Sequence, residues 1–374
     1  MRFCFITETW PDDNESHICG SGVQIYYLAK TLARKGHQVT VVLTAARKLE
    51  QNSHIHFFAL PPAKRLSSRL LRAENKKIVA KISECDPEVI YTRGKLPETK
   101  LALNVANLTG AKFVWASNSD QSGERFKYLN HTLDKKGWRL KSIPSILESW
   151  YIDKTIEATL SKADLVLAQT TWQQKRLYQN FQCSSVLFHS GHPVPLPIQK
   201  ANSKPRIVWL ANLTPVKRPR LFLRLVKECP RDIDFVMAGH AHNPKIINEI
   251  DTLKKERDNF SYLGGVSLRH SNELMASSDI FCLSSEYEGI ANTFIQACLH
   301  GLPTLSLGHQ PEDWITRYRL GSVADNFKEW KNSILDYAYD KRRRHDAGER
   351  AYRFAQNTFD IEKIADRLLM AVRS

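Results

Sequence analysis

Glu288 stands in a short acidic turn between a predicted buried strand and a predicted helix. The apolar run from Phe281 to Leu283 predicts the strand, two serines end it, and a helix begins at Asn292 and continues to the stop at Gly301. The start of a helix presents unpaired N–H groups and a partial positive charge, which suits a phosphate group. The carboxylate of Glu288 can accept hydrogen bonds from hydroxyl groups. These residue types, in this order, predict a site for a sugar that carries phosphate.

The same stretch resembles a signature of the family 4 retaining glycosyltransferases, which have the GT-B fold. Residues 288–291 read E-G-I-A where the family has E-G-F-G, and Gly301-Leu302-Pro303 matches its closing G-x-P. Ala291 stands at the family's second glycine and Gln296 at its second glutamate. The resemblance implies that Glu288 is catalytic and holds sugar hydroxyls, and that Gln296 contacts the ribose. It also implies donor contacts from Gly289, Ile290, Ala291, Asn292 and Thr293.

A second candidate loop follows the predicted strand from Arg206 to Leu210. Residues 212–218 resemble the family's G-R-L-x-x-x-K-G element, in which an arginine and a lysine hold the donor diphosphate. Lys217 matches the lysine, whereas Asn212 replaces the arginine and Arg218 the glycine. The resemblance implies that Lys217 is catalytic because it stabilises the charge of the departing diphosphate. Arg218 either supplies the missing positive charge or points outward.

Two loops that contain glycine complete the expected donor site. Gly20-Ser21-Gly22 opens a helix that follows the first predicted strand, residues 2–6. Glycine there lets the backbone approach a diphosphate closely, although a plain strand-to-helix turn has the same sequence features. Gly264-Gly265-Val266 follows an apolar run from Phe260 and resembles the family's loop under the nucleotide base.

The expected acceptor contacts come from Asn118 and Asp120, which follow the predicted strand from Phe113 to Trp115. In related enzymes a histidine often follows this strand and contacts the donor sugar or the acceptor. Asn118 is the nearest candidate in this sequence, and Asp120 could face the same cleft.

The elements that would position these loops alternate between short apolar strands and amphipathic helices. This pattern predicts an α/β protein, and the resemblance implies two Rossmann-like domains of GT-B type that face each other across a donor-binding cleft. A polar stretch that ends near Pro205 separates the expected domains, 1–195 for the acceptor and 205–357 for the donor. Residues 358–374 carry an apolar stripe, and the resemblance implies a final helix that crosses back to the first domain.

The composition limits the partners without choosing one. Lys and Arg number 54 against 39 Asp and Glu, a formal charge of +15, which favours nucleotide phosphates, an anionic membrane or nucleic acid. No nucleic-acid-binding module is recognisable, so nucleic acid is not expected. No apolar run approaches the roughly 18 residues of a membrane span, and no signal peptide is evident, which predicts a cytoplasmic protein.

The sequence predicts neither a metal site nor disulfides. Its 7 cysteines are scattered, without a Cys-x-x-Cys pair, so buried thiols are expected. The Asp-x-Asp at Asp232 and Asp234 enters a predicted strand instead of leaving one. His240 and His242 lack a third metal ligand.

Two basic stretches of the first domain suggest a peripheral position on the inner face of an anionic membrane. Arg65, Arg69, Arg72 and Lys76 fall on one face of a predicted helix, which is either a lipid-binding face or a solvated charged face. Residues 125–141 are basic and aromatic, and form either an acceptor or lipid surface or a disordered loop.

The reaction that the resemblance implies is transfer of a sugar from a nucleotide-diphosphate sugar to a hydroxyl group, with retention of configuration. The acceptor would be a glycan or a lipid-linked molecule, and no metal, cofactor or enzyme nucleophile would take part. The leaving diphosphate would itself take the acceptor proton. The alternative is a catalytically silent nucleotide-sugar-binding or scaffold protein, suggested by the departures at Asn212, Ala291 and Gln296.

Overall fold

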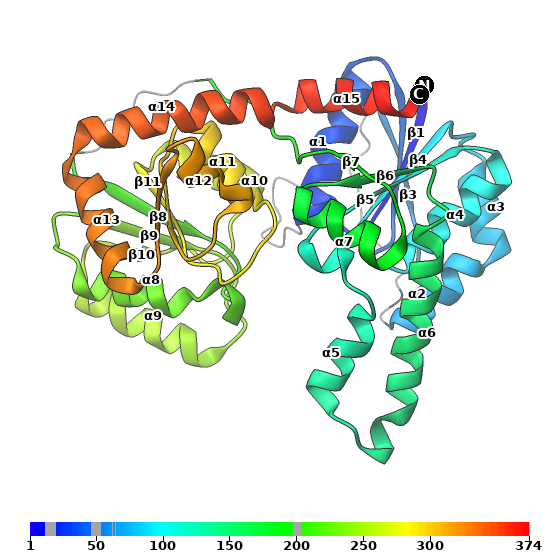
Figure 1. Ribbon diagram of the computed structural model, residues 1–374, viewed down its shortest axis with the longest axis horizontal. Helices are drawn as coiled ribbons and strands as arrows, with labels where there is room; N and C mark the ends of the chain where they lie inside the picture. The colour runs from blue at the N-terminus through cyan, green and yellow to red at the C-terminus, as the bar shows by residue number, and fades with distance from the viewer. Residues whose placement is uncertain (12–19, 46–53, 62, 64, 197–202, 374) are drawn as a thin grey trace. The chain divides into compact units, whose positions relative to one another are not determined.

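The computed structural model describes residues 1–11, 20–45, 54–61, 63, 65–196 and 203–373, which form two compact units (Figure 1). The first unit extends to Gly191 and takes up the chain again at Ile361 for the last helix. The second unit is formed mainly by the stretch from His192 to Asp360. Each unit is a parallel sheet between helices, so the expected pair of Rossmann-like α/β domains is confirmed.

The first sheet has seven strands in the order β3-β2-β1-β4-β5-β6-β7. The order reverses between β1 and β4, and at such a point a ligand can bind beyond the carboxyl ends of the strands. Strands β1 and β4 are almost wholly buried because helices cover both faces of the sheet. The strands are β1 (Arg2–Thr7), β2 (Gln38–Leu43), β3 (Ile55–Ala59), β4 (Val89–Arg93), β5 (Lys112–Ala116), β6 (Leu165–Ala168) and β7 (Val186–Leu187).

The last helix, α15, packs on α1 within the first unit. The ammonium of Lys35, just after α1, lies 2.8 Å from the carboxylate of Asp366, and the apolar stripe of α15 is buried. The expected return of the final helix to the first domain is therefore confirmed. The helices of this unit are α1 (Gly20–Arg34), α2 (Leu66–Glu74), α3 (Lys76–Ser83), α4 (Glu98–Thr109), α5 (Lys127–Lys136), α6 (Ile143–Leu160), α7 (Thr171–Phe181) and α15 (Ile361–Arg373).

The second sheet has six strands in the order β10-β9-β8-β11-β12-β13, which reverses between β8 and β11. Its strands are β8 (Arg206–Leu210), β9 (Asp234–Ala238), β10 (Phe260–Tyr262), β11 (Ile280–Leu283), β12 (Thr304–Leu307) and β13 (Gly321–Ala324). Its helices are α8 (Pro219–Glu228), α9 (Pro244–Glu256), α10 (Leu268–Ala276), α11 (Asn292–Leu299), α12 (Trp314–Arg317), α13 (Phe327–Tyr339) and α14 (Lys341–Thr358).

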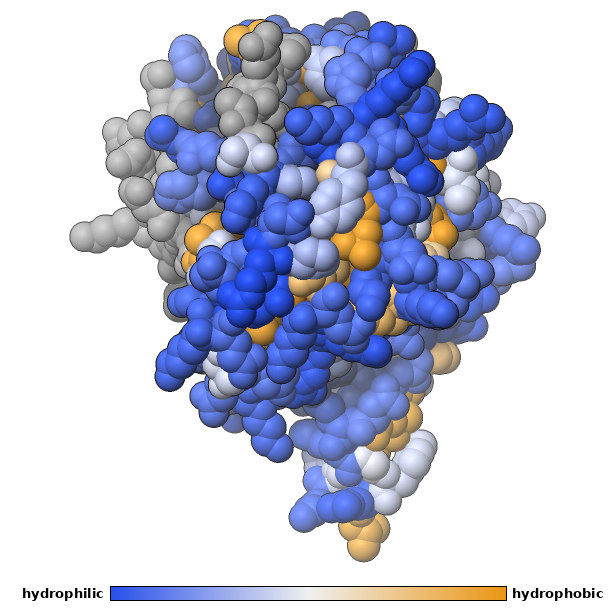
Figure 2. All heavy atoms as spheres, turned by 90° about the vertical axis from the view of Figure 1, so that its left-hand side faces the viewer, coloured by the Kyte–Doolittle hydropathy of each residue, from blue (hydrophilic) through white to orange (hydrophobic). Residues whose placement is uncertain are grey.

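Helices α5 and α6 form an antiparallel hairpin that projects away from the first sheet (Figure 1). The basic and aromatic stretch of residues 125–141 lies in this hairpin, so the interpretation of that stretch as a disordered loop is wrong. Hydrophobic surface is visible at the end of the projection, at the bottom of Figure 2, beside hydrophilic surface. In the part of the chain that the structure describes, no helix has the length and apolar character needed to span a bilayer.

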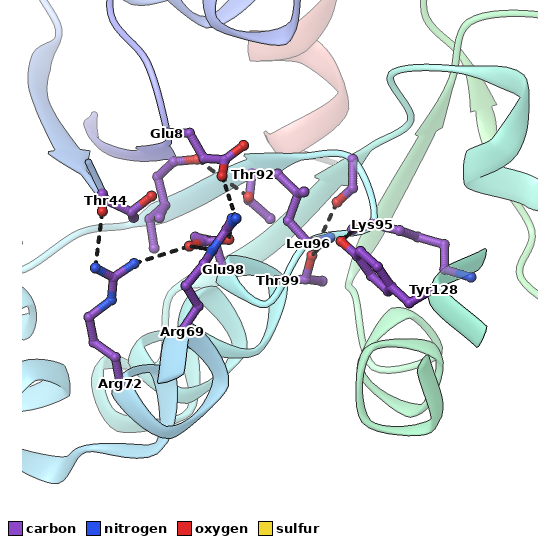
Figure 3. Close-up of polar contacts among 12 residues, drawn as sticks. Glu8, Thr44, Arg69, Arg72, Thr92, Lys95, Leu96, Glu98, Thr99 and Tyr128 are labelled. Atoms are coloured by element: carbon purple, nitrogen blue, oxygen red, sulfur yellow. Dashed lines mark hydrogen bonds and ion pairs between the residues drawn. The ribbon is translucent and has the colours of Figure 1, made fainter. Parts of the chain in front are cut away.

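The predicted basic face on residues 65–76 does not exist. The helix breaks at Asn75, whose side chain caps the start of α3, so Lys76 belongs to another helix than Arg69 and Arg72. Arg72 is buried and the side chain of Arg69 is only 13% exposed. Both pair with the buried carboxylate of Glu98, and Arg69 also pairs with Glu8 (Figure 3). Arginines that are held by carboxylates inside the unit offer no charge to a lipid surface.

Candidate active site

The two loops with the strongest predicted chemistry lie beside the reversal point of the second sheet. Lys217 ends the short turn that follows β8, Glu288 lies in the loop that follows β11, and their side chains form an ion pair. Each of the two side chains is 20% exposed. The Ser285 hydroxyl donates to the other carboxylate oxygen of Glu288 at 2.9 Å. The structure thus brings together the two predicted catalytic residues, which the sequence had assigned to different parts of the donor.

Further hydrogen bonds fix these two loops to each other. The N–H of Glu286 donates to the carbonyl of Val216 at 2.8 Å, and the Ser284 hydroxyl donates to the carbonyl of Lys217 at 2.7 Å. The indole N–H of Trp209 donates to the same hydroxyl at 2.9 Å. These hydrogen bonds fix the backbone of the loops that carry Lys217 and Glu288.

Arg218 holds the ends of two strands together. Its guanidinium donates to the carbonyls of Ser284 at 2.6 Å, Leu307 at 2.6 Å and Ser285 at 3.2 Å. Its backbone is left-handed, with φ 48°, in the position where the resemblance has a glycine. These bonds give Arg218 a structural role, and its contact with the donor phosphates stays a prediction.

Helix α11 starts at Asn292, as predicted, and its first turn follows the loop that carries Glu288. Gly289 and Thr293 are partly exposed, whereas the side chains of Ile290 and Ala291 are buried in the core. Any contact of Ile290 or Ala291 with a donor must therefore come from the backbone.

Gln296 is buried on α11 and faces α10. Its amide nitrogen donates to the hydroxyl of Ser271 at 2.9 Å and to the side-chain oxygen Oδ1 of Asn272 at 3.0 Å. A glutamate at this position could not make these two donations, because an ionised carboxylate only accepts hydrogen bonds. The predicted ribose contact of Gln296 stays a prediction.

The loop under the expected nucleotide base is packed closely. Gly239, which follows β9, has φ 138°, and a Cβ atom there would collide with the carbonyl of Ala211, directly before Asn212. The N–H of Gly239 donates to the carbonyl of Gly264 at 2.7 Å. Gly265 and Val266 line a cavity of about 840 Å³ together with residues of α10. The loops after β8, β9 and β10 therefore meet at one edge of the second sheet.

In the first unit, Gly20, Ser21 and Gly22 are the first three residues of α1. Gly22 is buried, and a Cβ atom there would lie 2.9 Å from the carbonyl oxygen of Thr9, in the segment after β1. The helix start thus approaches the carboxyl end of β1 closely. A plain strand-to-helix turn would do the same, and contact of this loop with a diphosphate stays a prediction.

Asn118 and Asp120 follow β5, but each is bonded to its surroundings. The side-chain oxygen Oδ1 of Asn118 accepts from the hydroxyl of Ser122 at 2.9 Å. The Asp120 carboxylate accepts from the amide of Gln173 at 3.0 Å. Both residues are partly exposed at the carboxyl edge of the first sheet, and their contact with an acceptor or sugar stays a prediction.

Sequence reasoning missed a cluster of charges at that edge (Figure 3). Glu8 follows β1, Glu98 opens α4 after β4, and Arg69 of α2 lies between them, 2.5 Å from Glu8 and 2.9 Å from Glu98. Burial raises the pKa of Glu8, although the charge of Arg69 opposes this. The only hint of this cluster in the sequence is Glu8, an acidic residue directly after the first strand. Its partners Arg69 and Glu98 are too far away in the sequence for a local pattern to reveal them.

Among the described residues, no three His, Cys, Asp or Glu side chains are grouped as a metal site would need. The cysteines of the described part form no disulfide. The two histidines considered as metal ligands, His240 and His242, stack on each other with ring centroids 6.1 Å apart. Asp232, of the Asp-x-Asp sequence, accepts a hydrogen bond from the Tyr339 hydroxyl.

Solved structures of similar fold were found for the whole chain. Sucrose-phosphate synthase from Thermosynechococcus elongatus has a TM-score of 0.73 at 14% identity, with 100% of this chain and 98% of that chain covered. WaaG, a glycosyltransferase involved in lipopolysaccharide biosynthesis, has a TM-score of 0.70 at 14% identity, with 99% of each chain covered. HepE from Anabaena, in complex with UDP-glucose, has a TM-score of 0.68 at 14% identity and covers 100% and 99%. A search of curated proteins gave no match.

Two parallel α/β units, together with the similarity of the whole chain to these glycosyltransferase structures, show the GT-B fold. The family model described as Glycosyltransferase Family 4 matches residues 18–191, and the model described as Glycosyl transferases group 1 matches residues 197–354. The chain belongs to family 4 of the glycosyltransferases.

Proposed function

We propose that this protein transfers a sugar from a nucleoside-diphosphate sugar to a hydroxyl group of a glycan or lipid-linked acceptor, with retention of configuration. The observation that carries the proposal is the pairing of Lys217 with Glu288 beside the first turn of α11. An ammonium and a helix N-terminus stabilise the negative charge that grows on a leaving diphosphate. A carboxylate next to them can hold sugar hydroxyls.

Uridine is the base we propose first. HepE, a neighbour in fold, has been solved with UDP and glucose and with UDP-glucose. The backbone groups of the loop Gly264-Gly265-Val266 would contact the base. We further propose that no metal is required, since Lys217 and the α11 N-terminus together supply positive charge where the diphosphate would lie.

The test is hydrolysis of a panel of nucleotide sugars in the absence of acceptor, followed by NMR. We expect release of a nucleoside diphosphate and of a free sugar that has, before mutarotation, the anomeric configuration of the donor. The rate should not change when a metal chelator is added. Early release of the opposite anomer would exclude retention, and loss of activity in the chelator would exclude a metal-free reaction.

The alternative, a catalytically silent binding protein, is tested by repeating these reactions with acceptors added. Tight binding of a nucleoside diphosphate without turnover of any nucleotide sugar, with or without simple sugars and glycolipids as acceptors, would identify a binding protein.

A further inference from the structure

The tip of the α5–α6 hairpin exposes large apolar side chains. Trp138 is 79% exposed and Leu140 is 87% exposed, both in the connection between the two helices. On α6, Ile143, Leu147 and Trp150 recur at intervals of four and three residues and are also exposed. This stripe continues from the tip along one face of α6.

The opposite face of α6 is the one that packs inside the unit. Ile152 and Ile156 are buried in a small cluster with Leu70 of α2. Helix α6 therefore has two apolar faces, and within the first unit only one of them is covered. A surface helix of a globular protein ordinarily has a single apolar face, so the exposed one needs a partner of its own.

The hairpin is held firmly at its base. The carboxylate of Asp153 on α6 accepts from the N–H groups of Tyr128 and Leu129 at 2.9 and 2.8 Å, which caps the start of α5. The ammonium of Lys95, after β4, is buried and pairs with Glu157 of α6 at 3.1 Å. The tip is thus a fixed projection from the first sheet (Figure 1).

Positive charge surrounds the exposed apolar residues. Two acidic residues of the hairpin, Asp134 and Glu148, are exposed near the tip, against four exposed basic residues. Lys136 donates to the Ser145 hydroxyl at 2.7 Å, which keeps its ammonium beside the start of α6. The four basic residues are Lys135, Lys136, Arg139 and Lys141.

We propose that the α5–α6 tip docks this protein on an anionic lipid surface, with Trp138 and Leu140 inserted at the level of the headgroups. Exposed tryptophan and aliphatic side chains bordered by lysine and arginine fit the boundary between headgroups and acyl chains. The apolar contact and the attraction of the basic residues to anionic lipid act together there.

The charges favour lipid over a second copy of this chain. In a symmetric dimer the same patch would face itself, and the four basic residues of one tip would face the four of the other. Like charges that meet in an interface oppose association. The tip is also a projection, which suits a broad surface better than a groove.

The experiment is flotation of the full-length protein with vesicles of phosphatidylcholine alone and with vesicles that also contain phosphatidylglycerol, at low and high salt. We expect binding to the anionic vesicles, weakened by salt. Replacing Lys135, Lys136, Arg139 and Lys141 by Gln should weaken binding about five-fold for each side chain removed. The double variant Trp138→Ser and Leu140→Ser should weaken it about 10- to 100-fold.

The matched control is Leu108→Ser, because Leu108 is an exposed apolar residue of the same unit, on α4. It should bind vesicles as the parent does. Thermal unfolding and nucleoside-diphosphate binding of all variants should match the parent, which separates this proposal from the proposed reaction. Absence of parent binding to anionic vesicles at low salt, or equal binding by the tip variants, would overturn it. So would a dimer in solution that the Trp138 and Leu140 variant abolishes.

Discussion

Lys217 and Glu288 neutralise each other at the edge of the second sheet. A donor diphosphate would compete with the Glu288 carboxylate for the Lys217 ammonium, and both are charged acceptors of similar kind. The sugar hydroxyls would in turn occupy the carboxylate. If the proposed roles hold, the ion pair would couple the two halves of the donor, because the diphosphate would bind Lys217 and the sugar would bind its partner Glu288.

Lys217→Ala should weaken nucleoside-diphosphate binding and lower turnover about 10- to 100-fold, the equivalent of losing a charged hydrogen bond. Glu288→Gln should impair transfer but bind the bare nucleoside diphosphate as tightly as the parent or more tightly, because Lys217 loses its competing carboxylate. Calorimetric binding and single-turnover transfer measure both effects.

Two exposed charged residues of the second unit serve as controls. Lys227 lies in the last turn of α8 and Glu286 lies two residues before Glu288. Lys227→Ala and Glu286→Gln should leave binding and transfer unchanged. If Lys217→Ala binds the nucleoside diphosphate as well as the parent, the phosphate site has been placed wrongly.

His192, where the chain passes from the first unit into the second, should make the second unit sensitive to acid. Burial lowers its pKa from 6.5 to about 4, although the hydrogen bond to Asn292 at the start of α11 opposes this. Between these pH values the unfolded chain takes up a proton and the folded chain does not. The free energy of unfolding should therefore decrease as the pH is lowered from 6.5 to about 4, by up to about 3 kcal/mol in total.

Denaturation of the second unit at pH 6.5 and at pH 4 gives the measurement for His192. The slope against pH should be smaller in His192→Gln than in the parent. His345→Gln, at an exposed histidine of α14, should keep the parent slope. An unchanged slope in the His192 variant would show that this group does not govern acid stability.

At the scale of elements, the sequence predicted the strand-loop-helix units well because their signals are local. Buried parallel strands are continuous apolar runs, and glycines of positive φ, such as Gly36 after α1 and Gly301 after α11, stop the helices where expected. The candidate loops follow from the same logic, since each connects a strand to the next helix.

The sequence failed where partners are distant. Arg69 and Arg72 lie on one helical face, but the periodicity does not show that Glu98, in another helix, neutralises both. Nor does it show that Glu288 pairs with Lys217, because the two residues belong to separate strand-loop units. Burial of opposite charges against each other is a property of the packed unit and not of either helix.

The α5–α6 hairpin should depend on one carboxylate. Asp153→Ala removes the acceptor of two N–H groups at the start of α5, and loss of such a cap costs about 1 kcal/mol. Hydrogen exchange should accelerate in the first turn of α5 while the sheet keeps its protection. Asp134→Ala, at an exposed position of α5, should change neither the stability nor the exchange in the first turn of α5.

At the scale of the molecule, the end of the chain should stabilise the unit formed by its beginning. Leu368 is fully buried on α15, which packs on α1. Leu368→Ala should destabilise the first unit by about 2–5 kcal/mol. Hydrogen exchange should rise in α1 and β1 and not in α13 or α14. Met370→Ala, an exposed substitution on α15, is the control; faster exchange confined to the second unit would contradict the assignment.

The stretch from His192 to Asp360, which forms most of the second unit, begins and ends at points that are adjacent in space. The N–H of His192 donates to the carbonyl of Phe359 at 2.8 Å, and His192 and Asp360 form a parallel bridge. Topologically, the stretch between them is an insert whose two ends already meet, so closing it requires little loop entropy. A recombination event at these two junctions could exchange the whole candidate donor domain. It would leave the first unit, including α15 and the hairpin tip, as an intact host.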